Sequence, residues 1–417
     1  MNREMEHIDM QAGTIGFRVA TTEGERRAGR YIEQELAQYG LQEVRQEPFP
    51  CSSEIVSGLF PYILTIIGSA LLAPFAPLFG LGGMLTAPAS MITEMRRNRG
   101  PVMRLTRRGT SHNVISILPA SGERKARVVL MAHYDSVRVH GYMKPHAGKP
   151  GTTRRLMQPL LALSYLAAIG STILGLVARR KHNAKLVRST RRIGGLAGAT
   201  MLTVASPLLV GQAIPGFDGE GANDNASGVA VMLSTAEQLA RTPLENTEIW
   251  FVATGAEETG LNGARALLQK HDKELKDAYF FAIDTVGAGR IHYSTQERFM
   301  RNAEVPHEVL DILVTASEKG QHGAIPFPVH GGATDAAAML DKRYKAASIC
   351  CLIKDGKWPE INWPTDVRKY VEPEVLPKVT AFMKDILFEI NRRSNTKESL
   401  IKSSSVQAFK HSSIQFH

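Results

Sequence analysis

Residues 127–136 read Arg-Val-Val-Leu-Met-Ala-His-Tyr-Asp-Ser, an apolar run that ends abruptly in a histidine and an aspartate. A short, continuous apolar run of this kind predicts a strand buried on both faces. Similar strands are predicted at 248–253, 278–283 and 346–352, and helices at 25–40, 229–239, 304–319 and 373–393. Strands that alternate with helices predict the α/β class, with a mixed, mostly parallel-centred sheet covered by helices on both faces.

Three further polar motifs stand at the ends of predicted strands or at the start of a helix. They are Gly-Ala-Asn-Asp-Asn-Ala-Ser-Gly at 221–228, Thr-Gly-Ala-Glu-Glu-Thr-Gly at 254–260 and Ala-Ile-Asp-Thr at 282–285. Each motif alone is typical of a turn, a helix cap or a solvated face. Open α/β sheets bind ligands at the carboxyl ends of their strands, so we expect the four motifs to converge on one site.

The residue types in these motifs favour a metal centre. The candidates are His133, Asp135, Asp224, Glu257, Glu258 and Asp284. Imidazole and carboxylate ligands suit zinc, cobalt or manganese, whereas calcium prefers oxygen ligands alone. A two-metal hydrolase needs a bridging carboxylate, terminal ligands on each ion and a general base for the attacking water.

Their spacing suggests a division of roles. Asp135 is two residues from His133 along an extended segment and can hold the second nitrogen of that imidazole. Asp224, in a glycine-flanked turn, can approach two metals at once. Glu257 and Glu258 point in different directions at a strand end, so that one can ligate while the other handles the proton of the water.

Taken in order, these motifs resemble peptidase family 28. The pattern is His-x-Asp, Gly-Ala-x-Asp-Asn-x-Ser-Gly, Glu-Glu-x-Gly-Leu-x-Gly and Asp-x-x-Gly. The family contains leucyl-type aminopeptidases, glutamate carboxypeptidase-like enzymes and glutaminyl cyclases. The likeness extends to 16–18, 112–115 and 372–374, and it covers roughly 5–54, 109–140 and 215–393.

The resemblance implies two zinc ions and a role for each residue. His133 and Asp284 would hold one zinc, Asp224 would bridge, and Glu258 would hold the other zinc. Glu257 would be the general base, and Asp135 would orient His133.

One position departs from the family pattern, because Asn362 stands where the family has a histidine on the Glu258 zinc. An amide oxygen is a poorer zinc ligand than imidazole, which weakens the expected second site. His330 is the alternative ligand for that zinc.

Three uncharged stretches interrupt the likeness, at 55–93, 156–178 and 193–214. The first is long enough for a hairpin, and each of the others is about one bilayer long, for which ~20 residues are needed. Much of the net charge of +10 lies in basic runs beside them, at 96–108 and 179–192, as is typical of juxtamembrane segments. We therefore predict transmembrane helices and contact with membrane lipid. Buried core helices or an apolar lid are the alternative, and no nucleic-acid signature accompanies the basic runs.

The predicted organisation is a peptidase domain at 1–54, 94–142 and 215–393, with hydrophobic inserts at 55–93 and 143–214 and a flexible tail at 394–417. The inserts fall between the motifs, so each must enter and leave the membrane on the same side. We predict a multi-pass protein. The polar first ten residues do not form a secretory signal peptide, which favours a catalytic domain that faces the cytoplasm.

The sequence thus predicts a membrane-anchored zinc aminopeptidase that acts on peptides. A carboxypeptidase or glutaminyl-cyclase reaction at the same site is an alternative that the motifs do not separate. A third hypothesis, suggested by Asn362, is a degenerate peptidase that serves as a membrane binding or scaffold protein.

Overall fold

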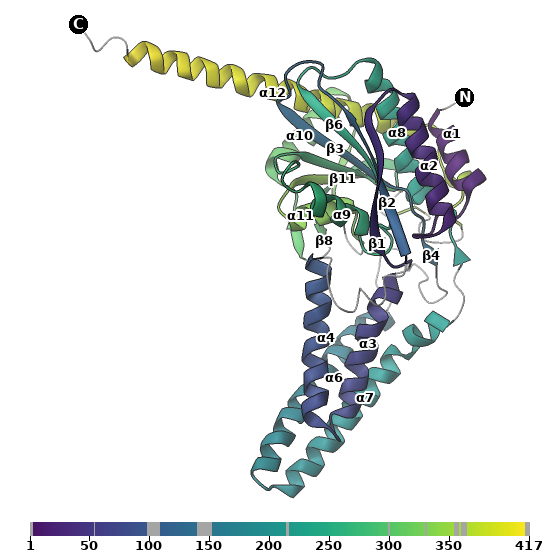
Figure 1. Cartoon of the computed structure of the whole chain (residues 1–417), viewed down its shortest axis with the longest axis vertical. Helices are drawn as coiled ribbons and strands as arrows, with labels where there is room; N and C mark the ends of the chain where they lie inside the picture. The colour runs from purple at the N-terminus through teal and green to yellow at the C-terminus, as the bar shows by residue number, and fades with distance from the viewer. Residues whose placement is uncertain are drawn as a thin grey trace. The chain divides into compact units, whose positions relative to one another are not determined.

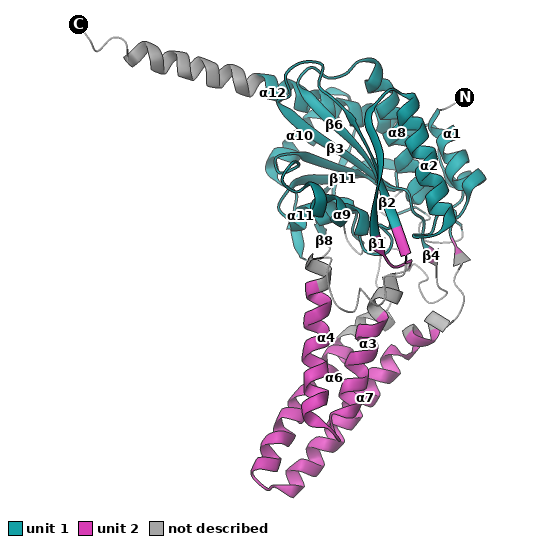
Figure 2. Ribbon diagram, in the orientation of Figure 1, with its two compact units in different colours: residues 1–49, 111–137, 219–417 teal, residues 50–110, 138–218 magenta. Residues whose placement is uncertain are grey.

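The computed structural model describes residues 3–53, 55–97, 109–139, 152–213, 217–298, 301–329, 332–353, 358–359 and 365–412. The chain divides into two compact units, coloured separately in Figure 2. Unit 1 contains residues 1–49, 111–137 and 219–417, and unit 2 contains 50–110 and 138–218. The inserts predicted at 55–93 and 143–214 overlap largely with unit 2, whose two segments begin a few residues earlier in each case.

Unit 1 is built on one mixed sheet (Figure 1). Its strands are β1 (Gln42–Cys51), β2 (Gly109–Leu118), β3 (Ala126–His133), β6 (Thr247–Thr254), β7 (Tyr279–Ile283), β8 (Arg290–Arg298), β9 (Asn302–Glu304), β10 (Ile325–Pro328) and β11 (Lys345–Leu352). Their order in the sheet is β1-β2-β6-β3-β7-β11-β8-β10, with β9 paired to β8. The central strands β6, β3, β7 and β11 are parallel, whereas β2 and β8 run antiparallel to β6 and β11.

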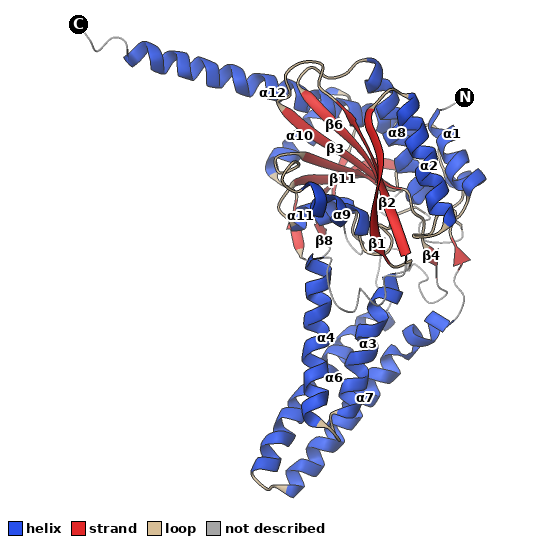
Figure 3. Cartoon of the chain, in the orientation of Figure 1, coloured by secondary structure: helices blue, strands red, loops and turns tan. Residues whose placement is uncertain are grey.

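Helices cover both faces of this sheet (Figure 3). One group is α8 (Ser227–Arg241), α10 (His307–Lys319) and α12 (Leu376–Ser412), and a second group is α9 (Asn262–His271) and α11 (Asp335–Asp341). Residues 128–131 of β3 are fully buried between these layers, as their continuous apolar run predicts. The predicted α/β class with a parallel-centred mixed sheet is confirmed.

Two helices near the N-terminus, α1 (Arg3–Ile8) and α2 (Glu23–Gln38), pack against α8. Thr22 caps α2 by accepting a hydrogen bond from the backbone N–H of Glu25. Ala28, Ile32 and Leu36 recur every four residues and are fully buried, so that one stripe of α2 faces the core. At the other end of the chain α12 runs past residue 393, where the sequence predicts a flexible tail to begin.

Unit 2 consists mainly of α3 (Ile55–Leu72), α4 (Pro77–Arg97), α6 (Thr152–Arg180) and α7 (Ala184–Ala213). A short antiparallel ribbon, β4 (Arg138–Val139) with β5 (Phe217–Asp218), also belongs to it. The four helices pack through small residues: a side chain at Gly83 of α4 would collide with Ser69 of α3, and one at Gly198 of α7 would press on Leu71. The bundle core contains Ile67, Ala70, Ala73, Met84, Ala168, Ala197, Met201 and Ala205.

By length and composition, one helical segment among the described residues could cross a membrane, Pro159–Arg180 of α6. The apolar part of α3, Phe60–Leu72, is shorter. Frequent Gly, Ala and Pro residues lower the hydropathy of the other stretches. Membrane spans at 55–93 and 193–214 therefore stay predictions.

The contact between α10 and α12 generates a pH-dependent prediction. Burial raises the pKa of Glu389, but hydrogen bonds from Arg392, Lys319 and Arg393 outweigh it and lower the pKa to about 2. A lowered pKa stabilises the fold above the ordinary value of 4.5, and this stabilisation is lost as the pH falls towards 2. Glu389→Gln should cost about 1–3 kcal/mol of unfolding free energy at pH 7.

Urea unfolding followed by tryptophan fluorescence checks this, since all three tryptophans lie in unit 1. The difference between wild type and Glu389→Gln should shrink steadily below pH 4.5. Exposed Glu304, substituted in the same way, should leave the midpoint unchanged. An unaltered midpoint for Glu389→Gln at pH 7 would contradict the assignment.

Candidate metal centre

The predicted site residues lie at the carboxyl edge of the parallel strands. His133 is the last residue of β3, Asp284 follows β7 directly, and the Glu257–Glu258 pair follows β6. Asp224 comes from η3 (Ala222–Ala226), the helical turn that leads into α8. Adjacent parallel strands end at the same edge of a sheet, so residues far apart in the chain meet there.

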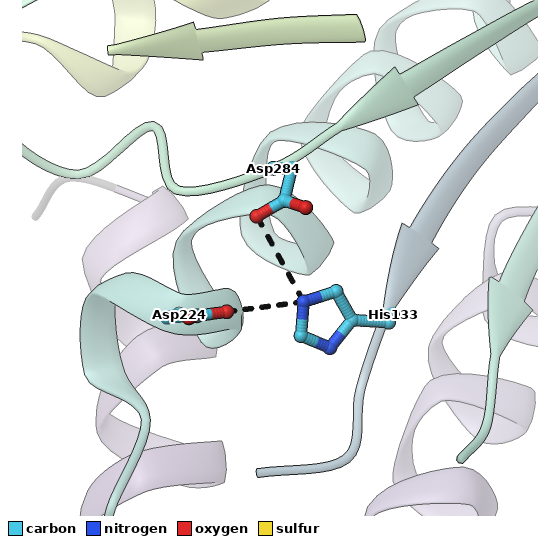
Figure 4. Close-up of side chains that lie close together, drawn as sticks. All are labelled: His133, Asp224 and Asp284. Carbon is cyan, nitrogen blue, oxygen red and sulfur yellow. Dashed lines mark ion pairs between the residues drawn. The ribbon is translucent and has the colours of Figure 1, made fainter. Parts of the chain in front are cut away.

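Three of these side chains form a compact group, shown in Figure 4. His133, Asp224 and Asp284 are all buried, and each offers a ligand atom within 4.8 Å of the others. The Nε2 atom of His133 lies 3.1 Å from Asp224 Oδ1 and 3.8 Å from Asp284 Oδ1. A nitrogen lone pair that faces two carboxylates needs a proton or a cation between them, which is the donor set that zinc prefers.

Asp135 has two contacts that fix its neighbours. Its backbone carbonyl oxygen lies 3.2 Å from Nδ1 of His133, closer than its carboxylate oxygen at 3.6 Å. A carbonyl can only accept, so this contact assigns the ring proton to Nδ1 and leaves Nε2 free to ligate. The Asp135 carboxylate accepts hydrogen bonds from the backbone N–H groups of Glu257 (3.0 Å) and Glu258 (3.1 Å), and it thereby holds the Glu-Glu turn.

The turn that carries Asp224 is fixed from two sides. The Asp366 carboxylate accepts from the backbone N–H groups of Asn223 (2.7 Å) and Asp224 (3.0 Å). Asn225 donates to the carbonyl of Ile283 (2.8 Å) and accepts from the N–H of Thr285 (3.1 Å). These bonds fasten η3 to the residues on either side of Asp284, which explains why Asp224 and Asp284 meet.

Arg18 is a buried cation beneath the site. Its guanidinium group donates to five backbone carbonyl oxygens, at distances from 2.6 to 3.1 Å. Two of them belong to Tyr134 and Gly221, next to the metal-site residues of β3 and η3. Burial lowers the pKa of Arg18 to about 10, against the attraction of Asp366, Asp135 and Asp224, so it remains charged at neutral pH.

Arg18 and Asp366 were not predicted as parts of this site. Arg18 lies in the 16–18 segment of the family likeness and Asp366 in the stretch that contains Asn362, but neither carries a metal-ligand pattern of its own. Their contacts join segments far apart in the chain. The two alternative ligands for the second zinc, His330 and Asn362, lie outside the described residues.

The electrostatics of the cluster favour a bound cation. Burial and the neighbouring carboxylates raise the pKa values of Glu257 and Glu258 well above the ordinary value for glutamate, despite the attraction of His133. Burial would lower the pKa of His133, but Glu257, Asp135, Asp224 and Asp284 raise it well above its ordinary value. Buried carboxylates that repel one another are stabilised by a divalent cation.

Buried imidazole and carboxylates at the ends of parallel strands define an α/β protein with a candidate metal site, and comparison with known proteins narrows the class of protein further. The model of peptidase family M28 matches residues 206–386. A curated relative, "Probable lipoprotein aminopeptidase LpqL" of Mycobacterium tuberculosis (strain ATCC 25618 / H37Rv), is 46% identical over 55 residues, which are 13% of this chain and 11% of that protein. The matched stretch thus spans about a tenth of the relative's length.

Two solved structures resemble the chain over almost its whole length. The zinc aminopeptidase BSAP from Bacillus subtilis has a TM-score of 0.54 at 16% identity, covering 93% of this chain and 94% of that chain. The Bacteroides thetaiotaomicron glutaminyl cyclase bound to N-acetylhistamine has a TM-score of 0.53 at 13% identity, covering 92% and 96%. At these identities the likeness is one of fold. Together with the family match, it confirms the resemblance to peptidase family 28 that the motifs carry.

The contacts of Arg18 generate a prediction about metal affinity. Arg18→Lys keeps the charge but cannot reach all five carbonyl oxygens, since an ammonium group has only three donors. We expect unfolding free energy to fall by about 2–4 kcal/mol and zinc affinity to fall roughly 10- to 100-fold. Zinc competition with a chelating dye, on detergent-purified full chain, measures the second effect.

A matched control is Arg241→Lys, because the Arg241 side chain is exposed and pairs only across one turn of α8 with Glu237. It should change neither property. Unchanged zinc affinity in Arg18→Lys would mean that Arg18 does not position the site.

Proposed function

We propose that this protein is a zinc exopeptidase of the aminopeptidase type that acts on peptides and is attached to a membrane through unit 2. The observation that carries the enzymatic part is the buried group of His133, Asp224 and Asp284 at the carboxyl edge of the sheet. The turn that carries Glu257 and Glu258 donates two backbone hydrogen bonds to the carboxylate of Asp135, next to this group. The match to peptidase family M28 supports the same reading.

The residues that would hold zinc are His133, Asp224, Asp284 and Glu258. His133, Asp224 and Asp284 form the buried group and Glu258 would add a third carboxylate, a donor set suited to the two zinc ions that we propose. Bound zinc would supply Lewis-acid polarisation of the scissile carbonyl and a water of lowered pKa. The weaker second ion follows from Asn362, so the number of ions is part of the proposal.

The protein's own groups would do the proton transfer and the positioning. Glu257 would take a proton from the attacking water and later give it to the leaving amine. Asp135 would keep Glu257 in place through the backbone bond at 3.0 Å, and it would fix the tautomer of His133. The buried position of Glu257 excludes bulk water from this transfer.

Glutaminyl-cyclase chemistry is the second candidate. The fold likeness to a glutaminyl cyclase, with a TM-score of 0.53, is the observation that supports it. In that reaction the N-terminal amine would attack the glutaminyl side-chain amide, and Glu257 would carry a proton from the amine to the departing ammonia.

The decisive variant is Glu257→Ala. It should lower turnover of an N-terminal aminoacyl reporter by about 10²- to 10⁴-fold while zinc content stays at the wild-type level, because the general base is not a ligand. Zinc per chain is measured on detergent-purified protein beside the initial rates. Exposed Glu245→Ala serves as control and should alter neither value.

The substrate that is turned over distinguishes the candidate functions. Turnover of the aminoacyl reporter supports the aminopeptidase, and cyclisation of an N-terminal glutaminyl peptide alone supports the cyclase. Less than one zinc per chain, with no turnover of amino-terminal, carboxy-terminal or glutaminyl substrates, would instead support a degenerate scaffold protein.

Membrane attachment rests on the inverted packing of unit 2. The interior of the bundle holds small residues such as Ala70 and Ala168, whereas large apolar side chains lie outside, with Leu163 65% and Leu196 71% exposed. A water-soluble bundle has the opposite arrangement, and small residues between helices are typical of membrane proteins. The apolar segment Pro159–Arg180 supports the same proposal. We further propose a multi-pass arrangement with unit 1 facing the cytoplasm.

Extraction experiments test this attachment. The full chain should stay in the membrane pellet through carbonate at high pH and enter solution only with detergent. Leu163→Arg with Leu196→Arg should reduce the membrane-retained fraction, since an arginine at the bilayer centre costs about 2.5–3.5 kcal/mol. Val314→Arg, at a half-exposed site on α10, is the matched control. Release of the wild type by carbonate would contradict the proposal, and protease access in sealed vesicles reports the orientation.

A further inference from the structure

The connection between α6 and α7 is strongly basic. The basic residues are Arg179, Arg180, Lys181, Lys185, Arg188, Arg191 and Arg192, and all seven are exposed. The sequence has no aspartate or glutamate from 152 to 213, so neither helix can neutralise this charge. Exposed cations without acidic neighbours on their own helices are available to an anionic partner.

A small hollow lies within unit 2 at this end of the helices. It is a shallow hollow of about 270 Å³, a volume that includes open solvent, and it is lined by residues of α6, of α7 and of the turn between α3 and α4. Arg179 and Arg191 are both in its lining, with Ser171, Thr172 and Thr190. Two arginines at one hollow can bind a phosphate group, because guanidinium groups bind phosphate oxygens through paired N–H donors.

Glycines allow α6 and α7 to approach closely beside this hollow. A Cβ atom at Gly175 would lie 3.0 Å from Thr190 Oγ1, and one at Gly194 would lie 3.0 Å from Ser171 Oγ. The hydroxyl groups of Ser171, Thr172 and Thr190 donate to carbonyl oxygens of their own helices, so the donors to a phosphate come from the two arginines. Their oxygen lone pairs remain able to accept hydrogen bonds from a hydroxyl-bearing headgroup.

Apolar side chains beside the hollow indicate that the phosphate belongs to a lipid. Pro74 and Pro77 of the α3–α4 turn line the hollow. Phe75 between them is 78% exposed, and Phe79 is 80% exposed. Exposed aromatic side chains next to a basic cluster fit the boundary between headgroups and acyl chains, whereas a free phosphate ion would gain nothing from them.

We propose that this hollow binds the phosphate of an anionic phospholipid, with Arg179 and Arg191 as the recognition residues. The inference rests on the proposed membrane attachment of unit 2. Carbonate extraction tests the membrane attachment, whereas lipid binding to detergent-purified protein tests this site. Either proposal can therefore be contradicted without the other.

The test titrates detergent-purified full chain with short-chain phosphatidylglycerol and follows retained lipid by native mass spectrometry. Arg179→Gln with Arg191→Gln should weaken binding roughly thirtyfold, the effect of two lipid-facing charges. The matched control is Arg180→Gln with Arg192→Gln, which removes the same charge from outside the lining and should weaken binding less than about threefold. Equal losses in the two pairs would overturn the proposal in favour of general charge attraction.

Two further measurements separate the remaining possibilities. Gly194→Val places a side chain against Ser171 and Pro74 in the lining of the hollow and keeps all seven charges, and at unchanged helix content it should weaken phosphatidylglycerol binding as well. Unaltered binding in this variant would overturn the site. Phosphatidylcholine should bind poorly, and inorganic phosphate should not compete. Competition by inorganic phosphate at the same concentration would mean a free-phosphate site, and equal binding of phosphatidylcholine would remove the role of charge.

Discussion

The repulsion among carboxylates buried at one edge of the sheet constrains the whole of unit 1. Asp135, Asp224, Glu257 and Asp284 come from four segments, and all are buried. Bringing these groups together costs free energy unless cations and backbone N–H groups compensate. The guanidinium group of Arg18 and the backbone N–H groups that donate to Asp135 and Asp366 supply part of that compensation.

The same constraint explains the density of hydrogen bonds around the site. The backbone of η3 is bonded to Asp366 on one side and, through Asn225, to the segment around Asp284 on the other. The Glu-Glu turn is held by Asp135. Ligands fixed in this way lose little freedom when a cation binds, so the apparatus is preorganised before any ion or peptide arrives.

The parts of the structure that depend on local sequence pattern could be predicted from the sequence. Apolar runs such as 127–132 predicted the central strands, and the polar residues that end them predicted which side chains gather at the edge. The convergence of His133, Asp224 and Asp284 follows from the parallel order of β3 and β7. Arg18 and Asp366 could not be predicted, because their partners are distant in sequence. The predicted end of α12 was also wrong, because the polar residues after 393 are typical of a flexible tail.

The apolar inserts were located from composition, but their arrangement was not. The absence of charge does not indicate which residues face inward. The packed bundle shows that five alanines lie in its core beside Ile67, Met84 and Met201, whereas many leucines are exposed. Glycine, alanine and proline dilute the hydropathy of α4 and α7 while allowing close helix contacts. The residues that allow the helices of the bundle to pack closely are therefore also those that lower their hydropathy.

The interrupted order of unit 1 along the chain has a consequence for biosynthesis. β3 with His133 leaves the ribosome before α6 and α7, whereas η3 with Asp224 leaves after them. The sheet of unit 1 therefore cannot be completed around the site until both α6 and α7 have been synthesised. Until then the apolar strands β2 and β3 lack their pairing partners β6 and β7. Such late, non-local pairing slows folding and leaves strand edges open to aggregation, so the nascent half-sheet is a natural client for chaperones.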